Sequence, residues 1–228
     1  MGVIAGERLG IGLDQVNIPS DATEYLDILR GAGVPFYSIA DFLATNPPMV
    51  EVGRGASGRV FGTQLDEVPI TFKLTYADGN QDLMLDLVRR TGSTYGPTKV
   101  KRSRWGDSER MIDRGISQVC GHYVGHALYP DYIPAPICMW TDTGEPGSNV
   151  VGYSLPFTEG DAVRICDHPE LLALGREIHQ QQTIYLGDNG SVNRSRNLVI
   201  NSTTGEKRFI DVRLWQRGDE WKWLLPSI

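Results

Sequence analysis

The sequence predicts an α+β fold with two lobes, in which a lobe with a small antiparallel sheet and a helix comes before a truncated second lobe. Apolar runs bounded by turn residues predict the strands of the sheet. Apolar residues three and four positions apart predict a helix that begins at Asp107 or Ser108 and runs to about Ala127. The 228 residues, 40% apolar and 22% charged, suit one domain or one two-lobed unit. The expected strands cover residues 60–63, 68–74, 135–140 and 149–155.

The composition narrows the classes of function. A net charge of −6 argues against a general affinity for nucleic acids. No apolar run approaches the roughly 18 residues of a membrane span, and no signal peptide is visible, so we expect a soluble chain without membrane insertion. Three widely spaced cysteines fit reduced, mostly buried thiols in a cytosolic setting. His122 and His126 lack a metal-binding pattern and are interpreted as surface or core histidines.

Residues 1–48 are predicted to form an N-terminal helical extension. Asp21 and the acid three residues later resemble a capping box, which starts a first helix. A second short helix is expected from about Ser38 to Ala44, and Asn46-Pro-Pro ends it. The extension is either a helical pad on the small lobe or a secretion, targeting or partner-binding arm, and the sequence favours neither.

The chain is organised around a glycine-rich stretch, Glu51-Val-Gly-Arg-Gly-Ala-Ser-Gly-Arg-Val-Phe61. Its glycines follow the spacing G-x-G-x-x-G, which lets a backbone lie against phosphates without Cβ collisions. In a dinucleotide-binding fold such glycines open a helix. Here a strand, a turn at Leu65-Asp-Glu and a second strand that contains Lys73 follow them. The alternative is a glycine-rich hairpin with a solvated Lys73, which is common in small β domains.

A strand, a Gly-rich turn, a second strand and then a Lys together resemble the nucleotide-binding hairpin of the protein kinases. The resemblance implies that Lys73 contacts the phosphates of ATP and pairs with Glu109 on the following helix. Alternatively, Glu109 is a helix-start carboxylate favoured by the helix dipole, and Asp113 is then the reserve partner of Lys73. The resemblance also implies that the nucleotide contacts Gly53, Gly55, Ala56, Ser57, Gly58 and Val60.

In this resemblance the strand exit after residue 154 is the hinge that binds adenine through backbone groups. Pro156 has no N–H and cannot donate. The implied contacts are therefore the carbonyl of Leu155 and the N–H of Phe157 or Thr158.

The second half of the chain carries an acid, an Asn followed by an apolar strand, a turn and a second acid. This order resembles the catalytic-loop layout of kinases and kinase-like phosphotransferases. The resemblance implies that Asp188 accepts the proton of the attacking hydroxyl, and that Asn197 and Asp211 bind Mg²⁺ through oxygen atoms. Asn197 lies nine residues after Asp188 instead of the usual five, which implies a four-residue insertion. Asn193 has the regular spacing, but no strand follows it.

Other positions depart from the kinase pattern. Leu186-Gly187 precedes Asp188, as in aminoglycoside-type phosphotransferases, and Val212-Arg213 stands where Phe-Gly usually follows the metal-binding Asp. The chain ends soon after Asp211, so the expected large lobe is truncated and has no activation segment. This truncation resembles the minimal kinases that bacterial pathogens inject into host cells by type III secretion. It implies a virulence effector that acts in the host cytoplasm; without secretion the chain would be cytoplasmic.

The predicted domains are a kinase-like N-lobe over residues 49–157, with an insertion at 77–105, and a truncated C-lobe over 158–228. The insertion contains an expected helix from Asp82 to Arg90 and then a basic cluster. That cluster is either a solvated face or a docking surface for an acidic, activating host partner. Its members are Lys99, Lys101, Arg102 and Arg104.

The resemblance as a whole implies an ATP-dependent protein kinase that uses Mg²⁺ and phosphorylates a Ser, Thr or Tyr of a host protein. Two alternatives stay open. A nucleotide-binding pseudokinase that acts as an interaction module is favoured by Val212-Arg213. A small-molecule phosphotransferase shares the order of acid, Asn and acid, but usually adds a large helical domain for its substrate.

Overall fold

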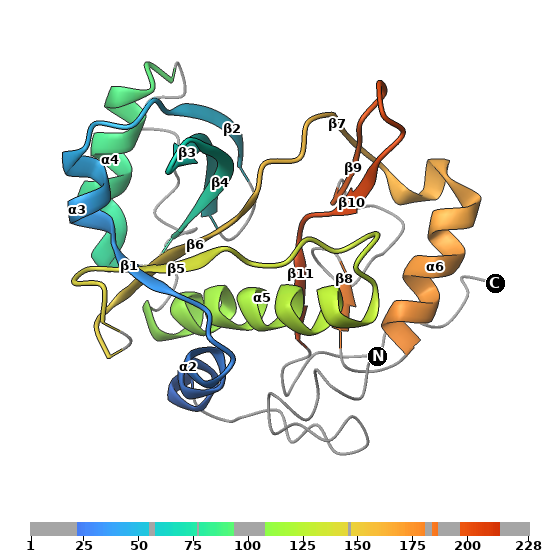
Figure 1. The fold of residues 1–228 in the computed structure, drawn as a ribbon, viewed down its shortest axis with the longest axis horizontal. Coiled ribbons are helices and arrows are strands. Elements are labelled where there is room, and N and C mark those ends of the chain that lie inside the picture. Colours follow the sequence, from blue (N-terminus) through green and yellow to red (C-terminus); the bar gives the residue numbers. More distant parts are fainter. Residues whose placement is uncertain are drawn as a thin grey trace. The chain divides into compact units, whose positions relative to one another are not determined.

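The computed structural model describes residues 22–54, 58–76, 78–93, 108–145, 147–180, 184–186 and 197–214 (Figure 1). Both helices and strands contribute to the fold, which confirms the predicted α+β class. The chain divides into two compact units. The sheet unit contains Leu29–Ile116 and Pro136–Phe157, and the hairpin unit contains Met1–Ile28, Ser117–Ala135 and Thr158–Ile228.

The sheet unit is built on one six-stranded sheet with the strand order β1-β5-β6-β4-β3-β2. The four predicted strand regions are confirmed as β3, β4, β5 and β6. The sheet is mixed and not purely antiparallel as predicted, because an additional strand, β1, pairs in parallel with β5. The strands are β1 (Phe36–Ser38), β2 (Val50–Arg54), β3 (Gly58–Leu65), β4 (Val68–Thr75), β5 (Cys138–Thr141) and β6 (Val150–Pro156).

Helices close to the first strands belong to the same unit. The predicted short helix is confirmed as α3 (Ile39–Ala44), and the Ser38 hydroxyl caps it by accepting the N–H of Asp41 at 3.2 Å. The sequence predicts an extension up to residue 48, whereas β1 and α3 are part of the sheet unit. The helix expected near Asp82 is confirmed as α4 (Gln81–Arg90), but the basic cluster lies outside the described residues.

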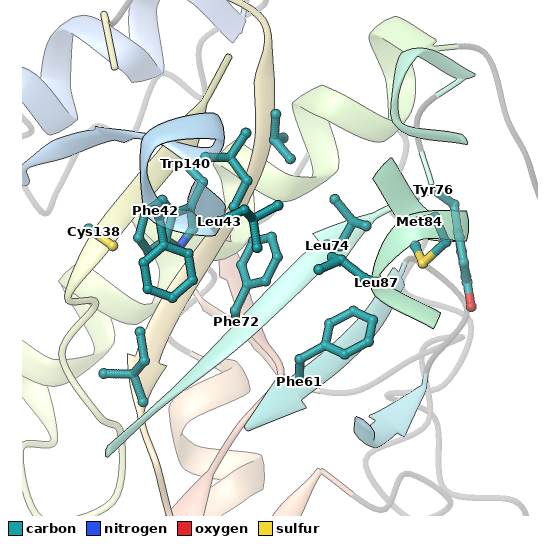
Figure 2. Close-up of a cluster of buried hydrophobic side chains, with 13 residues drawn as sticks. Phe42, Leu43, Phe61, Phe72, Leu74, Tyr76, Met84, Leu87, Cys138 and Trp140 are labelled. Atoms are coloured by element: carbon teal, nitrogen blue, oxygen red, sulfur yellow. The ribbon is translucent and has the colours of Figure 1, made fainter. Parts of the chain in front are cut away.

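One face of the sheet carries the hydrophobic core (Figure 2). α3 and α4 contribute to this core together with alternate residues of the central strands. Trp140 lies at its centre, with its ring centroid 4.7 Å from that of Phe42 and 5.8 Å from that of Phe72. The indole N–H is also satisfied, because it donates to the Ser154 hydroxyl at 2.7 Å. The core therefore holds α3 and α4 against the same face of the sheet.

The hairpin between β3 and β4 sets the register of this sheet. Asp66 and Glu67 form its two-residue turn with φ values of 50° and 68°. Positive φ at both turn positions gives a backbone twist that matches two antiparallel strands. The ladder then runs without interruption from the Leu65–Val68 pair to the Gly58–Thr75 pair.

The hairpin unit contains two small sheets, one whole helix and parts of two others. The strand order is β10-β9-β7 in one sheet and β11-β8 in the other, and all pairs are antiparallel. The predicted helix is confirmed as α5 (Ser108–Leu128), whose residues from 117 onward belong to this unit. The other elements are α2 (Ala22–Gly31), β7 (Asp161–Val163), α6 (Pro169–Gln180), β8 (Ile184–Leu186), β9 (Leu198–Ile200), β10 (Lys207–Phe209) and β11 (Val212–Leu214).

Two further expectations concern the whole chain. Within the described ranges, no helix combines the length and the apolar character that crossing a bilayer requires. The three cysteines form no disulfide, and two of them, Cys120 and Cys138, are buried while Cys166 is exposed. Burial raises the pKa of both buried thiols, that of Cys138 to about 12 despite a hydrogen bond with the Ser154 hydroxyl.

We predict that only one thiol of the native protein reacts rapidly with a thiol reagent such as dithionitrobenzoate at pH 8. A raised pKa leaves almost no thiolate at Cys120 and Cys138, and burial also blocks access to them. Cys166→Ser should abolish the rapid phase, and denaturant should expose all the remaining thiols. Rapid modification of two cysteines in the folded protein would contradict the buried positions.

Candidate functional site

The face of the sheet opposite the hydrophobic core carries Lys73. In the register of the sheet, Val60, Lys73 and Tyr153 stand directly opposite one another on β3, β4 and β6. Residues opposite one another share a face, so Val60 and Tyr153 flank Lys73. The Lys73 side chain is 8% exposed, and its Nζ lies 5.7 Å from the centroid of the Tyr153 ring. This distance is within the range of a cation–π contact.

The next row of the same face is mainly apolar, and of its three members Thr71 is the one that is partly exposed. It contains Gly62, Thr71 and Leu155, again directly opposite one another. A Cβ on Gly62 would lie 3.1 Å from the Val52 side chain and 3.3 Å from the Phe157 ring. The missing side chain therefore lets Val52 and Phe157 close over β3. Both apolar side chains are exposed to solvent, Val52 at 47% and Phe157 at 41%.

A shallow depression of about 310 Å³ lies at this end of the sheet. Phe157 lines it together with residues from the outer ends of β2, β3 and β4. This volume falls at the lower limit of small-molecule sites. Its lining is mainly apolar, which suits a flat, weakly polar ring. The lining residues are Pro48, Met49, Val50, Gly62, Thr63, Gln64, Pro69 and Phe157.

The hinge groups are partly engaged within the sheet unit itself. The Phe157 N–H donates to the carbonyl of Pro69 at 3.2 Å. The Leu155 carbonyl accepts the hydroxyl of Thr71, also at 3.2 Å. Of the two amides named for the hinge, that of Phe157 thus has a partner in the sheet unit. The Phe157 side chain, in contrast to its N–H, faces the depression.

The glycines of the Gly-rich stretch have different reasons to be glycine. A Cβ on Gly58 would lie 2.2 Å from the Leu74 carbonyl oxygen, so the pairing of β3 with β4 itself requires glycine there. A Cβ on Gly53 would meet only the Val60 side chain at 4.0 Å, an ordinary contact. Packing therefore gives no reason for Gly53. Gly55, Ala56 and Ser57 lie outside the described residues.

A buried ion pair lies behind the Gly-rich stretch. Arg59 Nη1 is 3.0 Å from Glu51 Oε2, and the two side chains are 2% and 10% exposed. Arg59 pairs with Leu74 in the ladder and therefore faces the core side of the sheet, opposite Lys73. The pair links β2 to β3 across the Gly-rich turn. Sequence analysis missed both residues, because a charged residue in a turn region is usually solvated.

The helix partner expected for Lys73 is only partly described. Glu109 belongs to the first turn of α5, as predicted, but its side chain and that of Asp113 lie outside the described set. The Lys73–Glu109 pair therefore stays a prediction.

In the hairpin unit, Asn197 and Asp211 come close together at the base of the β9–β10 hairpin. The Asn197 carbonyl accepts the N–H of Ile210, the residue before Asp211, at 2.8 Å. The side-chain Nδ2 of Asn197 is buried and has no hydrogen-bond partner in the described part of the chain. Asp211 is half-buried and stands directly before β11.

Two residues of α5 contact this acid and the residue after it, and sequence analysis assigned neither to the site. Gln118 Nε2 donates to Asp211 Oδ1. The Val212 N–H donates to His122 Nε2 at 3.4 Å. Both side chains are fully buried. A polar pair spaced four residues apart on the buried stripe of a helix is the signal that could have identified them.

The remaining predicted residues lie outside the described part. Asp188 follows β8 by two residues and is not described, and neither is Asn193. Among the described residues, no group of three His, Cys, Asp or Glu side chains could hold a metal ion. The predicted metal ligands are an Asn and an Asp, Asn197 and Asp211, and therefore do not form a group of that kind. The structure thus brings together Val60, Lys73 and Leu155 in one unit, and Asn197 and Asp211 in the other.

Compared with known protein families, the sequence matches none of their models. The same holds for curated proteins, none of which matches it significantly.

We predict that Glu51→Gln lowers the free energy of unfolding by about 3 kcal/mol, because it removes the negative charge that pairs with a buried guanidinium. Asp86→Asn is the matched control. It breaks the exposed i,i+4 pair with Arg90 on α4 and should cost less than about 0.5 kcal/mol. Urea denaturation of both variants provides the measurement. Equal, small losses would mean that the Glu51–Arg59 pair does not hold β2 against β3.

Proposed function

We propose that this chain is an ATP-dependent phosphotransferase of the protein-kinase type, which transfers the γ-phosphoryl group of ATP to a protein hydroxyl. One observation carries the proposal. The strand after the Gly-rich hairpin presents Lys73 in line with Val60, on the face opposite the core and next to a mainly apolar, partly exposed row. A buried ammonium on the strand that follows the Gly-rich stretch, next to an apolar surface, suits the two ends of a nucleotide.

The sheet unit would bind the nucleotide. The purine would lie against the row of Gly62, Thr71 and Leu155, beside the exposed side chains of Val52 and Phe157 that close over Gly62. Lys73 would hold the phosphates, and the Tyr153 ring beside it limits the directions in which its ammonium can turn. The backbone of residues 53–58 would cradle the phosphates, and Gly53, which packing does not require, fits that role.

The hairpin unit would bind the metal and the acceptor. Asn197 and Asp211 supply an amide and a carboxylate oxygen, the ligand types that Mg²⁺ prefers. The ligand atom of Asn197 would be Oδ1, because its buried Nδ2 is a donor and cannot bind a cation. When bound there, Mg²⁺ would neutralise charge on the β- and γ-phosphates. Asp211 and Asn197 thus have the chemistry that this cofactor needs.

In the proposed reaction, the acceptor oxygen forms a bond to the γ-phosphorus. The bond from that phosphorus to the β–γ bridging oxygen breaks, and ADP leaves with the electron pair. Asp188 takes the proton of the acceptor hydroxyl. Most of the rate enhancement then comes from positioning and from the fixed charges around the phosphates.

A protein is the proposed acceptor, with Ser, Thr or Tyr as the modified residue. The resemblance to minimal effector kinases supports this choice, as well as delivery of the chain by a bacterium into a host cell. The experiment is incubation of the purified chain with labelled ATP, Mg²⁺ and a host-cell lysate. A labelled protein band supports the proposal. A labelled metabolite would indicate a small-molecule phosphotransferase, and no label would indicate a pseudokinase.

We predict that Asp211→Ala lowers phosphoryl transfer by roughly 100-fold or more, because a metal ligand worth several kcal/mol in the transition state is lost. The matched control is Asp82→Ala, which removes an exposed carboxylate from α4 and should leave the rate unchanged. Circular dichroism must show both variants folded. Transfer by folded Asp211→Ala at the wild-type rate would refute the metal assignment.

We predict that Asn197→Ala loses far more activity than Asn193→Ala. Asn197 directly precedes β9, and its carbonyl accepts the N–H of Ile210. Its backbone is therefore held in place close to Asp211. Asn197→Asp should retain part of the activity, because a carboxylate oxygen can replace the amide oxygen at Mg²⁺. A larger loss from Asn193→Ala would mean that the insertion follows the metal residue.

A further inference from the structure

The segment Asp211–Arg213, called here the acid segment, lies directly against the backbone of α5. A Cβ on Gly121 would be 2.3 Å from the Cα of Arg213 and 2.5 Å from its carbonyl carbon. No side chain fits at position 121 without moving the acid segment. Two polar side chains flank this contact, Gln118 before Gly121 and His122 after it.

His122 uses both of its ring nitrogens on backbone groups. Its Nδ1 is 3.2 Å from the Pro134 carbonyl oxygen, and its Nε2 is 3.4 Å from the Val212 nitrogen. A carbonyl can only accept and a backbone N–H can only donate. The Nδ1–H therefore donates to Pro134, and Nε2 accepts from Val212. Only the neutral Nδ1–H tautomer satisfies both bonds.

Gln118 lies one helical turn before His122 on the same stripe of α5. Its Nε2 donates to Asp211 Oδ1, and the side chain is fully buried. Burying an amide and an imidazole costs free energy unless both are hydrogen-bonded. Neighbouring positions on the same helix are apolar, such as Ile116 and Val119. The buried polar residues of α5 are Ser117, Gln118 and His122, and of these Gln118 and His122 bond to the acid segment.

We infer that Gln118 and His122 are positioning residues that fix the Asp211 carboxylate for metal binding. The inference rests on the proposed function, in which Asp211 is a ligand of Mg²⁺. Gln118 fixes one carboxylate oxygen, and His122 fixes the peptide N–H that follows the acid. Together they fix the orientation of the Asp211 carboxylate and the position of the Asp211 backbone along α5. Such partners of metal ligands commonly govern metal affinity.

The test measures Mn²⁺ affinity by electron paramagnetic resonance, with full-length protein saturated with a non-hydrolysable ATP analogue. Gln118→Met keeps the side-chain length and removes the donor. We expect its Mn²⁺ dissociation constant to rise roughly tenfold or more. The metal-free affinity for the nucleotide analogue should stay within about twofold of wild type. A merely structural role would lower both affinities or neither.

A second pair of variants covers the case in which Gln118→Met does not fold. Gln at position 122 can place its carbonyl oxygen near the position of Nε2, whereas Asn reaches only the position of Nδ1. We expect His122→Gln to bind Mn²⁺ within about threefold of wild type and His122→Asn to bind it roughly tenfold more weakly. His126→Gln is the matched control. His126 contacts the Ile133 carbonyl at 2.8 Å, one turn further along α5, and its replacement should change nothing.

The outcomes separate the inference from the proposed function. Weaker Mn²⁺ binding by Gln118→Met or His122→Asn, with normal metal-free nucleotide affinity, supports the inference. Wild-type Mn²⁺ binding by a folded Gln118→Met, or equal binding by His122→Asn and His122→Gln, overturns it while the proposed function stands. The control is the Mn²⁺ affinity of the ATP analogue without protein. If the wild-type protein–analogue complex binds Mn²⁺ no more tightly than the analogue alone, the proposed function fails and the inference fails with it.

Discussion

The register of β4 between β3 and β6 is the constraint on which the candidate nucleotide site depends. β4 is hydrogen-bonded on both sides, and its alternate residues are divided between the core and the opposite face. A slip of one residue would bring Phe72 to the open face and drive Lys73 into the core. Gly58 and Gly152 hold the register, because the backbones of Leu74 and Lys73 approach them too closely for a Cβ.

Four buried polar residues lie next to candidate site residues or motifs. An apolar core needs no charge or amide, and each one buried must be compensated. Arg59 lies behind the Gly-rich turn, Lys73 faces its front, and Gln118 and His122 contact the acid segment. Other buried polar residues serve the fold alone, such as Asn80, which donates to the carbonyls of Thr75 and Val151.

Much of the fold could be predicted from the sequence. β3, β4, β5 and β6 have apolar runs or alternation bounded by turn residues, and α4 and α5 have long apolar stripes with starting signals. The short strand β9 could also be predicted, from the apolar run after Asn197, whereas three other short strands could not. β1, β7 and β11 each have three residues, which is too few for alternation to be visible, and each exists only because a distant partner pairs with it. The Gly-rich motif led to Lys73, but nothing local connects Gln118 to Asp211, 93 residues further along the chain.

The parallel pairing of β1 with β5 has a consequence for how the protein is made. Phe36 pairs with Met139, roughly 100 residues later in the chain, and β4 needs β6 as its second neighbour. The sheet unit is therefore interrupted in sequence and cannot close during synthesis until residues 136–157 have left the ribosome. Until then the core side of β3 and β4 has neither Trp140 nor β5 to cover it. The nascent chain passes through a stage with an exposed apolar sheet face, when a chaperone would be of most use.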